Sequence, residues 1–223
     1  MTHTLGRQLA AEALGTGLLL AVIVGSGIMG ERLAGGNAAI ALLANAIATG
    51  CGLAVLIAVL GPISGAHFNP VVSLSMAALD EFPWSRVLPY LGVQVFFALL
   101  GVAAAHFMFG EPLLTPSSKM RAGPHQLWSE FVATFGLMLV VWGCVRQRLP
   151  ATPILVGAYI TAAYWFTAST SFANPAVTIA RCLTDTFAGI RPDDVPGFIA
   201  AQFAGAAVGT WVSNWLFRES RVA

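Results

Sequence analysis

The chain has 223 residues, of which 57% are hydrophobic and only 9% are charged, and its mean hydropathy is +0.77. A soluble domain carries roughly 25% charged residues, so this composition excludes an ordinary soluble protein and indicates a membrane protein. The net charge of +1 gives no basis for nucleic-acid binding. The cysteines Cys51, Cys144 and Cys182 are too scattered for a metal site and are typical of small apolar residues.

Six apolar segments are long enough to cross a bilayer as helices, because a hydrocarbon core of about 30 Å needs about 20 residues. In chain order they are about 9–29, 38–60, 87–109, 127–145, 152–168 and 195–217. Six crossings place both chain ends on the same side of the membrane. We therefore predict an all-α membrane protein with one transmembrane domain over residues 1–223, whose halves are about 1–110 and about 125–223.

Two further apolar segments each carry an Asn-Pro pair: His-Phe-Asn-Pro-Val at 67–71 and Phe-Ala-Asn-Pro-Ala at 172–176. The stretches that follow, 71–79 and 176–183, are too short to cross and suit half-helices. A helix that begins inside the bilayer needs protein or water around its free N–H groups, so it marks the lining of a pore. The predicted pore motif comprises Asn69, Pro70, Val71, Asn174, Pro175 and Ala176.

The two halves of the chain repeat the same polar residues in the same order. Each half also has three spans and one broken segment, which forces the halves to be inverted relative to each other. The half-helices then enter from opposite faces and meet N-terminus to N-terminus near the midplane. The matching pairs are Glu12 and Glu130, Thr16 and Thr134, the two Asn-Pro pairs, and Gln94 and Gln202.

Glu12 and Glu130 are costly inside a membrane, so each is a functional candidate. Two interpretations are open: they are proton or cation sites of a carrier, or they accept hydrogen bonds from the backbone of the re-entrant loops. We favour loop support, because each lies near the start of a span and recurs with a loop. Among the four histidines only His67 lies beside a motif, and we expect it to pack or hydrogen-bond at the pore wall.

These motifs, taken together, resemble those of the aquaporin, or major intrinsic protein, family. The resemblance covers nearly the whole chain, and two Asn-Pro boxes with two Glu and two Gln in repeat order are highly specific. It implies six transmembrane helices and two re-entrant half-helices in an inverted repeat, with a pore in each subunit of a homotetramer. It also implies passive conduction of water or small uncharged solutes, with no catalytic residue, no cofactor and no metal.

The chain departs from the family pattern at the narrow filter of the pore. Most members have an arginine directly after the second box, where this chain has Val177, and an aromatic residue on the second span, where it has Thr49. The remaining filter positions fall on Ala162 in the fifth span, counted back twelve from Asn174, and on Ser171. Pore diameter and lining donors set selectivity in such pores, so we expect a wider and more permissive filter.

Members without the arginine include the AqpS type of bacterial arsenic-resistance operons, which this chain resembles most. The resemblance implies that the channel conducts As(OH)3, methylated arsenic species and glycerol-like solutes besides water. Arg181 lies one helical turn beyond Val177 and is positioned to offer a displaced positive charge to the outer vestibule. The alternative is that Arg181 binds a lipid headgroup or a loop partner such as Asp185.

The charge bias predicts a multi-pass protein of the inner (plasma) membrane with cytoplasmic termini, although six basic residues against five is a small difference. Those expected on the terminal side are Arg7, Arg86, Arg146, Arg148, Arg218 and Arg221. The expected partners are membrane lipid, small neutral solutes and further copies of the chain.

Two rival functions remain. An ion-coupled secondary transporter also uses inverted repeats and broken helices, but it needs a central ionisable residue, and only the two repeat glutamates qualify. A membrane enzyme is disfavoured, because no carboxylate–histidine or metal-binding cluster accompanies His67 in the sequence.

Overall fold

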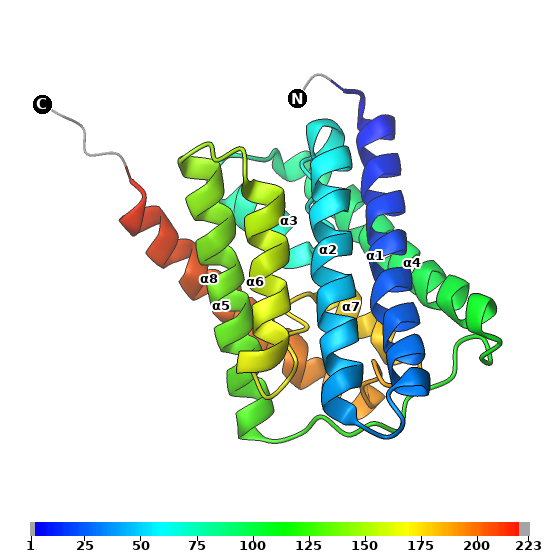
Figure 1. Ribbon diagram of the computed structural model, residues 1–223. Coiled ribbons are helices and arrows are strands. Elements are labelled where there is room, and N and C mark those ends of the chain that lie inside the picture. Colours follow the sequence, from blue (N-terminus) through cyan, green and yellow to red (C-terminus); the bar gives the residue numbers. More distant parts are fainter. Residues whose placement is uncertain (1–2, 219–223) are drawn as a thin grey trace, which may run out of the picture.

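The structure is a computed structural model that describes residues 3–218, so Arg221 and the ends of the predicted 1–223 domain lie outside the described residues. The described part is helical throughout its regular elements (Figure 1). The elements are α1 (Leu5–Leu33), α2 (Ala38–Ser64), α3 (Pro70–Ala78), α4 (Trp84–Phe109), α5 (Pro124–Arg146), α6 (Thr152–Phe166), α7 (Pro175–Arg181), η1 (Pro192–Asp194) and α8 (Val195–Leu216).

Five of these helices, α1, α2, α4, α5 and α8, are long and apolar enough to cross a membrane. Helix α6 has 15 residues and ends at Phe166, so the predicted span 152–168 extends beyond the C-terminal end of the observed helix. The chain leaves the helix because Thr167 is extended (φ −112°, ψ 139°). The backbone of Ala168 then binds α5 instead, accepting from Gln126 and donating to Ser129.

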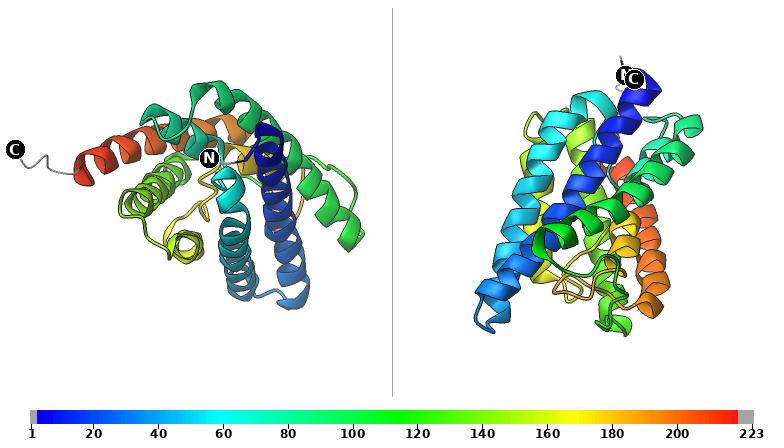
Figure 2. Two further views of the ribbon diagram at one scale, coloured as in Figure 1. Left: turned by 90° about the horizontal axis from the view of Figure 1, so that it is seen from above. Right: turned by 90° about the vertical axis from the view of Figure 1, so that its right-hand side faces the viewer.

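The five long helices and α6 pack as two sets of three, one set from each half of the chain. In the first half, α1 packs on α2 and α4; in the second, α5 packs on α6 and α8; and α2 packs on α6 across the halves. Seen from above, α5 and α6 lie on one side of the molecule and α1 and α4 on the other (Figure 2). Helix α1 begins and helix α8 ends at the same end of the bundle, as six crossings predict (Figure 1).

Helices α3 and α7 are the two short helices that follow the Asn-Pro pairs. In each, the asparagine is the N-cap residue in an extended conformation and the proline is the first helical residue, where its missing N–H is no loss. Figure 1 shows α3 in the half of the bundle where the chain ends lie and α7 in the other half. The two half-helices therefore meet in the interior, as the inverted repeat predicts.

Small residues allow the long helices to approach closely. A Cβ atom at Gly205 in α8 would overlap the backbone carbonyl of Phe131 in α5, and one at Gly101 in α4 would overlap that of Gly17 in α1. Because lipid tails are as apolar as the side chains, close packing of this kind holds membrane helices together. The same device thus joins the corresponding helix pair in each half.

We predict that Gly205→Ala lowers the thermal stability of the detergent-solubilised protein, by an amount typical of overpacking, about 1–3 kcal/mol. The matched control is Gly92→Ala in α4, where an added Cβ meets no atom within 4 Å. This control should be neutral or stabilising, because alanine is the better helix former. Equal melting temperatures for the two variants would contradict the close-packing argument.

Candidate functional site

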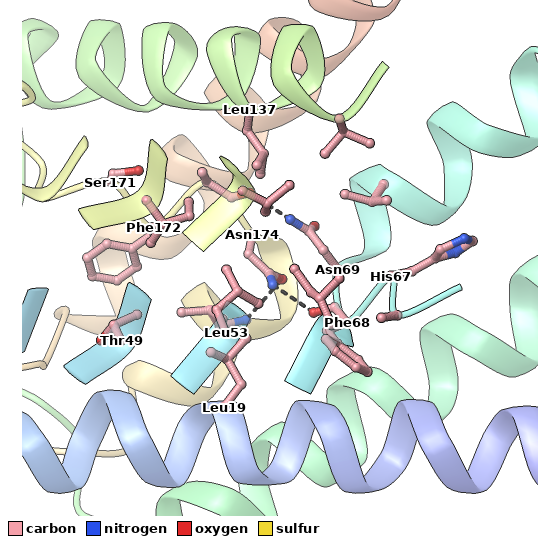
Figure 3. Close-up of a pocket in the computed structure, with 18 of the residues that line it drawn as sticks. Leu19, Thr49, Leu53, His67, Phe68, Asn69, Leu137, Ser171, Phe172 and Asn174 are labelled. Carbon is pink, nitrogen blue, oxygen red and sulfur yellow. Dashed lines mark hydrogen bonds between the residues drawn. The ribbon is translucent and has the colours of Figure 1, made fainter. Parts of the chain in front are cut away.

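The two Asn-Pro boxes are joined to each other by reciprocal hydrogen bonds. The Asn69 side-chain amide donates to the carbonyl of Ala173 at 2.8 Å, and the Asn174 amide donates to the carbonyl of Phe68 at 2.8 Å. Each asparagine oxygen caps its own half-helix, accepting from Val71 N in one case and from Ala176 N and Val177 N in the other. An amide NH2 has two donors, so each asparagine keeps one N–H for a passing solute. Figure 3 shows both amides pointing into the same space.

The loops that lead into the boxes have an unusual backbone that repeats in both halves. Ala66 and Phe68 have φ of 50° and 49°, and the corresponding Ser171 and Ala173 have φ of 51° and 47°. The left-handed region costs roughly 1–2 kcal/mol for each L-residue, so surrounding contacts must hold these conformations. The conformation cannot supply helical hydrogen bonds, which leaves the loop N–H groups in need of acceptors.

Glu12 supplies those acceptors for the first loop. Its carboxylate accepts from His67 N at 2.9 Å, from Phe68 N at 2.7 Å and from the hydroxyl of Ser64 at 2.7 Å. The amide of Gln94 donates to the same carboxylate at 2.8 Å and to the hydroxyl of Ser73 at 3.1 Å. Both Glu12 and Gln94 are fully buried.

Glu130 makes the matching contacts for the second loop. It accepts from Phe172 N at 2.8 Å, from Ala173 N at 2.9 Å and from the amide of Gln202 at 2.6 Å. Gln202 also donates to the hydroxyl of Thr178 at 2.8 Å, as Gln94 does to Ser73. These are the contacts that loop support requires, and they leave neither glutamate free in the cavity.

A cavity of about 280 Å³ passes between the helices beside the two asparagines. Its lining extends from Ser171 and Arg181 on one side of the Asn-Pro junction to Val145 and Thr152, where α5 ends and α6 begins. His67 lines the cavity on the Thr152 side of the Asn-Pro junction, and its Nδ1 lies 3.0 Å from the hydroxyl of Ser73. In Figure 3, His67 lies on one side of the asparagine pair and Ser171 on the other.

Three of the four predicted filter residues, Thr49, Ser171 and Val177, line this cavity. The fourth prediction, Ala162, is wrong: its side chain is exposed on the outside of α6 and does not line the cavity. Tyr164 lines it instead, and its hydroxyl donates to the hydroxyl of Thr49 at 3.2 Å. A tyrosine ring therefore fills part of the space that Thr49 and Val177 leave.

Arg181 is buried and lines the cavity, one turn beyond Val177 on α7. Its guanidinium lies over the ring of Phe172, 3.4 Å from the centroid, and its Nε donates to the carbonyl of Ala188. Asp185, the loop partner considered for it, instead accepts from the backbone and hydroxyl of Ser118. The positive charge of Arg181 thus faces the cavity and is held by an aromatic ring and a carbonyl.

Arg121 belongs to the same end of the cavity, and the sequence patterns did not single it out. It donates to the carbonyls of Gly189 and Ser169, at 2.8 and 3.0 Å, and so ties down the chain that leads to Ser171. Burial lowers the pKa of Arg121 to about 10. The pKa of Lys119 in the same loop falls to about 8, first through burial and then through the positive charges of Arg121 and Arg181. This mouth is therefore electropositive.

A comparison with known proteins now decides the family. The model of the family described as Major intrinsic protein matches residues 1–171, more than half of the chain. The chain belongs to the major intrinsic protein family. The second Asn-Pro box lies beyond the matched range, and its place in the family fold follows from the geometry of α7.

Individual members of the family are similar over nearly the whole chain. The aquaglyceroporin AqpS of Rhizobium meliloti is 52% identical over 97% of this chain and 93% of its own length. The probable aquaporin AqpM of Archaeoglobus fulgidus is 31% identical over 98% of this chain and all of its own length. The X-ray structure of the aquaglyceroporin from Plasmodium falciparum superposes with a TM-score of 0.78, covering 96% of this chain and 98% of that one. At 18% identity, that structure supports the fold alone.

These findings confirm the expected family, the membrane-embedded helical fold and its channel class. The roles of individual pore residues stay predictions, and the geometry above supports most of them. The exception is Ala162, whose place is taken by Tyr164 because the chain between α6 and Asn174 is irregular. A count back from Asn174 across that segment does not keep a helical register.

We predict that Glu130→Ala destabilises this major intrinsic protein more than Glu130→Gln. Alanine leaves the N–H groups of Phe172 and Ala173 without acceptors, at about 1–3 kcal/mol each, whereas glutamine keeps one acceptor oxygen. The measurement is the melting temperature in detergent. The variants Glu12→Ala and Glu12→Gln repeat the comparison at the matching position of the first half. Unchanged melting temperatures together with equal loss of flux in both variants would instead favour a transport role for the glutamate.

Proposed function

We propose that this chain is a passive channel for small uncharged solutes, conducting water, glycerol-like solutes, As(OH)3 and methylated arsenic species. The observation that carries the proposal is the cavity that passes the paired asparagines and reaches Ser171 at one side and Thr152 at the other. Solute can move along such a path without a change of conformation. The names of the related aquaglyceroporins support the glycerol-sized class.

Passive conduction is favoured over ion coupling by the state of the buried carboxylates. Glu12 and Glu130 are saturated by loop N–H groups and glutamine amides, so a proton or cation bound there would break the loops. Among the described residues, the cavity lining includes one carboxylate, Glu81, and it lies beyond α3 near the mouth. In the described part of the chain, no carboxylate lines the centre of the cavity, where an ion-coupling site would need one.

Uncharged solutes are favoured by the electrostatics of the path. The N-termini of α3 and α7 meet at the asparagines and carry partial positive charge, which repels cations. Arg181 adds a full positive charge at one mouth. An anion would have to leave water and pass a largely apolar wall that includes Leu53 and Ile160, which is costly.

The residues of the filter favour a solute that can form hydrogen bonds on one side and contact apolar groups on another. Thr49, Ser171 and Tyr164 present hydroxyl groups, and Val177 presents methyl groups at the position where the family resemblance implies an arginine. Ser171 Oγ is buried and has no hydrogen-bond partner among the described residues, so it is free to bind solute. A trihydroxy solute such as glycerol or As(OH)3 can bond to such hydroxyls. Because the Tyr164 ring lines the cavity where the sequence predicted Ala162, the proposed filter is narrower than the one expected from the sequence.

The assembly and location follow the family resemblance. We infer a homotetramer with one pore in each subunit, in the plasma membrane and with cytoplasmic termini. The common end of α1 and α8 supports the single-sided termini.

We predict that Asn174→Asp admits cations or impairs folding. The carboxylate keeps the cap of α7 but loses the donor to the Phe68 carbonyl and places a negative charge in the cavity. The matched control is Asn37→Asp, because Asn37 caps α2 in the same way at an exposed site away from the cavity. The measurements are proton and sodium leak into proteoliposomes, and melting temperature. Parent-like behaviour of both variants would leave Asn174 with a capping role only.

We predict that Val177→Arg lowers the permeability to glycerol and As(OH)3 more than the permeability to water. The guanidinium would occupy the filter beside Tyr164 and offer several donors to water. Val177→Leu is the control for side-chain bulk without charge and should change the solute-to-water ratio less. The assay is light scattering from proteoliposomes in solute and osmotic gradients.

Two outcomes would contradict this assignment of the filter. One is an unchanged solute-to-water ratio in correctly assembled Val177→Arg. The other is a large change in Arg181→Ala with none in Val177→Arg, which would mean that Arg181 forms the constriction from one turn away. Measuring all three variants in one lipid composition separates these cases.

A further inference from the structure

A second cleft adjoins one mouth of the pore, at the end of the bundle where α5 and α8 finish, and it shares Glu81 and Val145 with the pore cavity. Its volume is about 850 Å³, and it is bordered by residues from the ends of both helices and from the loop after α3. Three arginines border it: Arg146, Arg148 and Arg218. The opposing charge is Glu81, which pairs with Arg146 at 2.8 Å.

The ion pair leaves two arginines of the cleft uncompensated. Among residues 3–218, the side chains of Arg148 and Arg218 have no hydrogen bond or ion pair, and both are exposed. With Arg146 paired to Glu81, the described residues that border the cleft carry a net charge of +2 at this end of the bundle. Such a cleft suits an anionic group of phosphate size.

An apolar groove of about 420 Å³ lies between α3 and α8 and shares Asn214 with the arginine cleft. Its wall includes Leu74 on α3 and Phe203 on α8. Trp84 and Trp211 also border it and are 59% and 72% exposed. Exposed tryptophans of this kind gather at the membrane–water interface, which places the groove against lipid.

The cleft and the groove are continuous along one face of α8. Ala207, Trp211 and Asn214 follow one another at spacings of four and three residues, which is one stripe of α8, and Arg218 lies just beyond the end of the helix and borders the cleft with Asn214. The stripe therefore leads from an apolar trough within the membrane to a free arginine at its surface. From the groove to the cleft, the surface changes from apolar to positively charged. A phospholipid has the matching order, because its acyl chains are apolar and its headgroup carries a negative phosphate.

We propose that this surface binds one anionic phospholipid, with its phosphate on Arg148 and Arg218 and an acyl chain in the groove beside Ala207. A soluble anion would bind the arginines but leave the groove empty. A zwitterionic phospholipid such as phosphatidylcholine would fill the groove and bring a phosphate, but its cationic headgroup would cancel that charge, so the net positive charge of the cleft would stay unbalanced. The three arginines and Ala207 do not line the pore cavity, whereas Glu81 and Val145 border both the cavity and the cleft. Occupancy of the site is expected to stabilise the contact of α3 with α8.

The test measures lipid retention on the delipidated, full-length protein after exposure to equal amounts of dioleoylphosphatidylglycerol and dioleoylphosphatidylcholine. Native mass spectrometry should show preferential retention of phosphatidylglycerol. The double variant Arg148→Gln, Arg218→Gln should weaken that retention by roughly 30-fold, at the contribution expected of two interfacial arginines. Ala207→Phe, which fills the groove, should also lower it.

Matched controls separate this site from general attraction to the membrane. Arg7→Gln removes an exposed charge on α1 outside the cleft, and Val208→Phe adds a ring on the face of α8 next to the groove; neither should lower retention. Equal retention of the two lipids by the unmodified protein would overturn the proposal without any variant. So would an equal loss in Arg7→Gln, or full displacement of the phosphatidylglycerol by millimolar inorganic phosphate, which would reveal a site for soluble anions.

Discussion

The structure depends on one constraint: a polypeptide that turns back inside the membrane must find partners for its own N–H groups. The loops that end at Asn69 and Asn174 lie in the interior, in a left-handed conformation that gives them no helical hydrogen bonds. Glu12 and Glu130 accept from these loops, and the two asparagines bind each other's loops. Without these partners the half-helices could not begin where they do.

The same constraint explains why the path suits a channel. Protonation of a carboxylate that accepts from several loop N–H groups would weaken those hydrogen bonds, so a proton-coupled transport cycle would disturb the loops. At the centre of the path, the groups that meet a solute are the neutral amides of Asn69 and Asn174, together with the positive ends of α3 and α7; Arg181 and Glu81 line the path away from this centre. The inverted repeat supplies this arrangement from both sides of the membrane, so the path is polar at its centre and has no central charge to bind an ion.

The residues of the pore centre could be predicted from the sequence because they are polar residues in apolar surroundings. Asn69, Asn174, Glu12 and Glu130 stand out for that reason, and their order in the two halves predicts their pairing. The boundaries of the long helices were also close to prediction, since apolar length and flanking turns determine them.

The filter was harder to predict, because the chain between α6 and α7 is irregular. Thr170, Ser171 and Ala173 all have positive φ, so no helical count relates Asn174 to α6, and Tyr164 rather than Ala162 reaches the cavity. Arg121 is a residue of a long loop, and its contacts with Gly189 and Ser169 are distant in sequence. No local pattern marks such a residue; an arginine in an otherwise apolar chain was the only available signal.

The central claim is that solute crosses this protein through a fixed path and not through a cycle coupled to ions. The most direct measurement is the re-swelling of proteoliposomes in a glycerol gradient, with proton and sodium gradients collapsed by ionophores. The account predicts glycerol entry well above that of protein-free vesicles, at a rate proportional to concentration and unchanged by the ionophores. Entry that saturates at low concentration and disappears when the ion gradients are collapsed would contradict it.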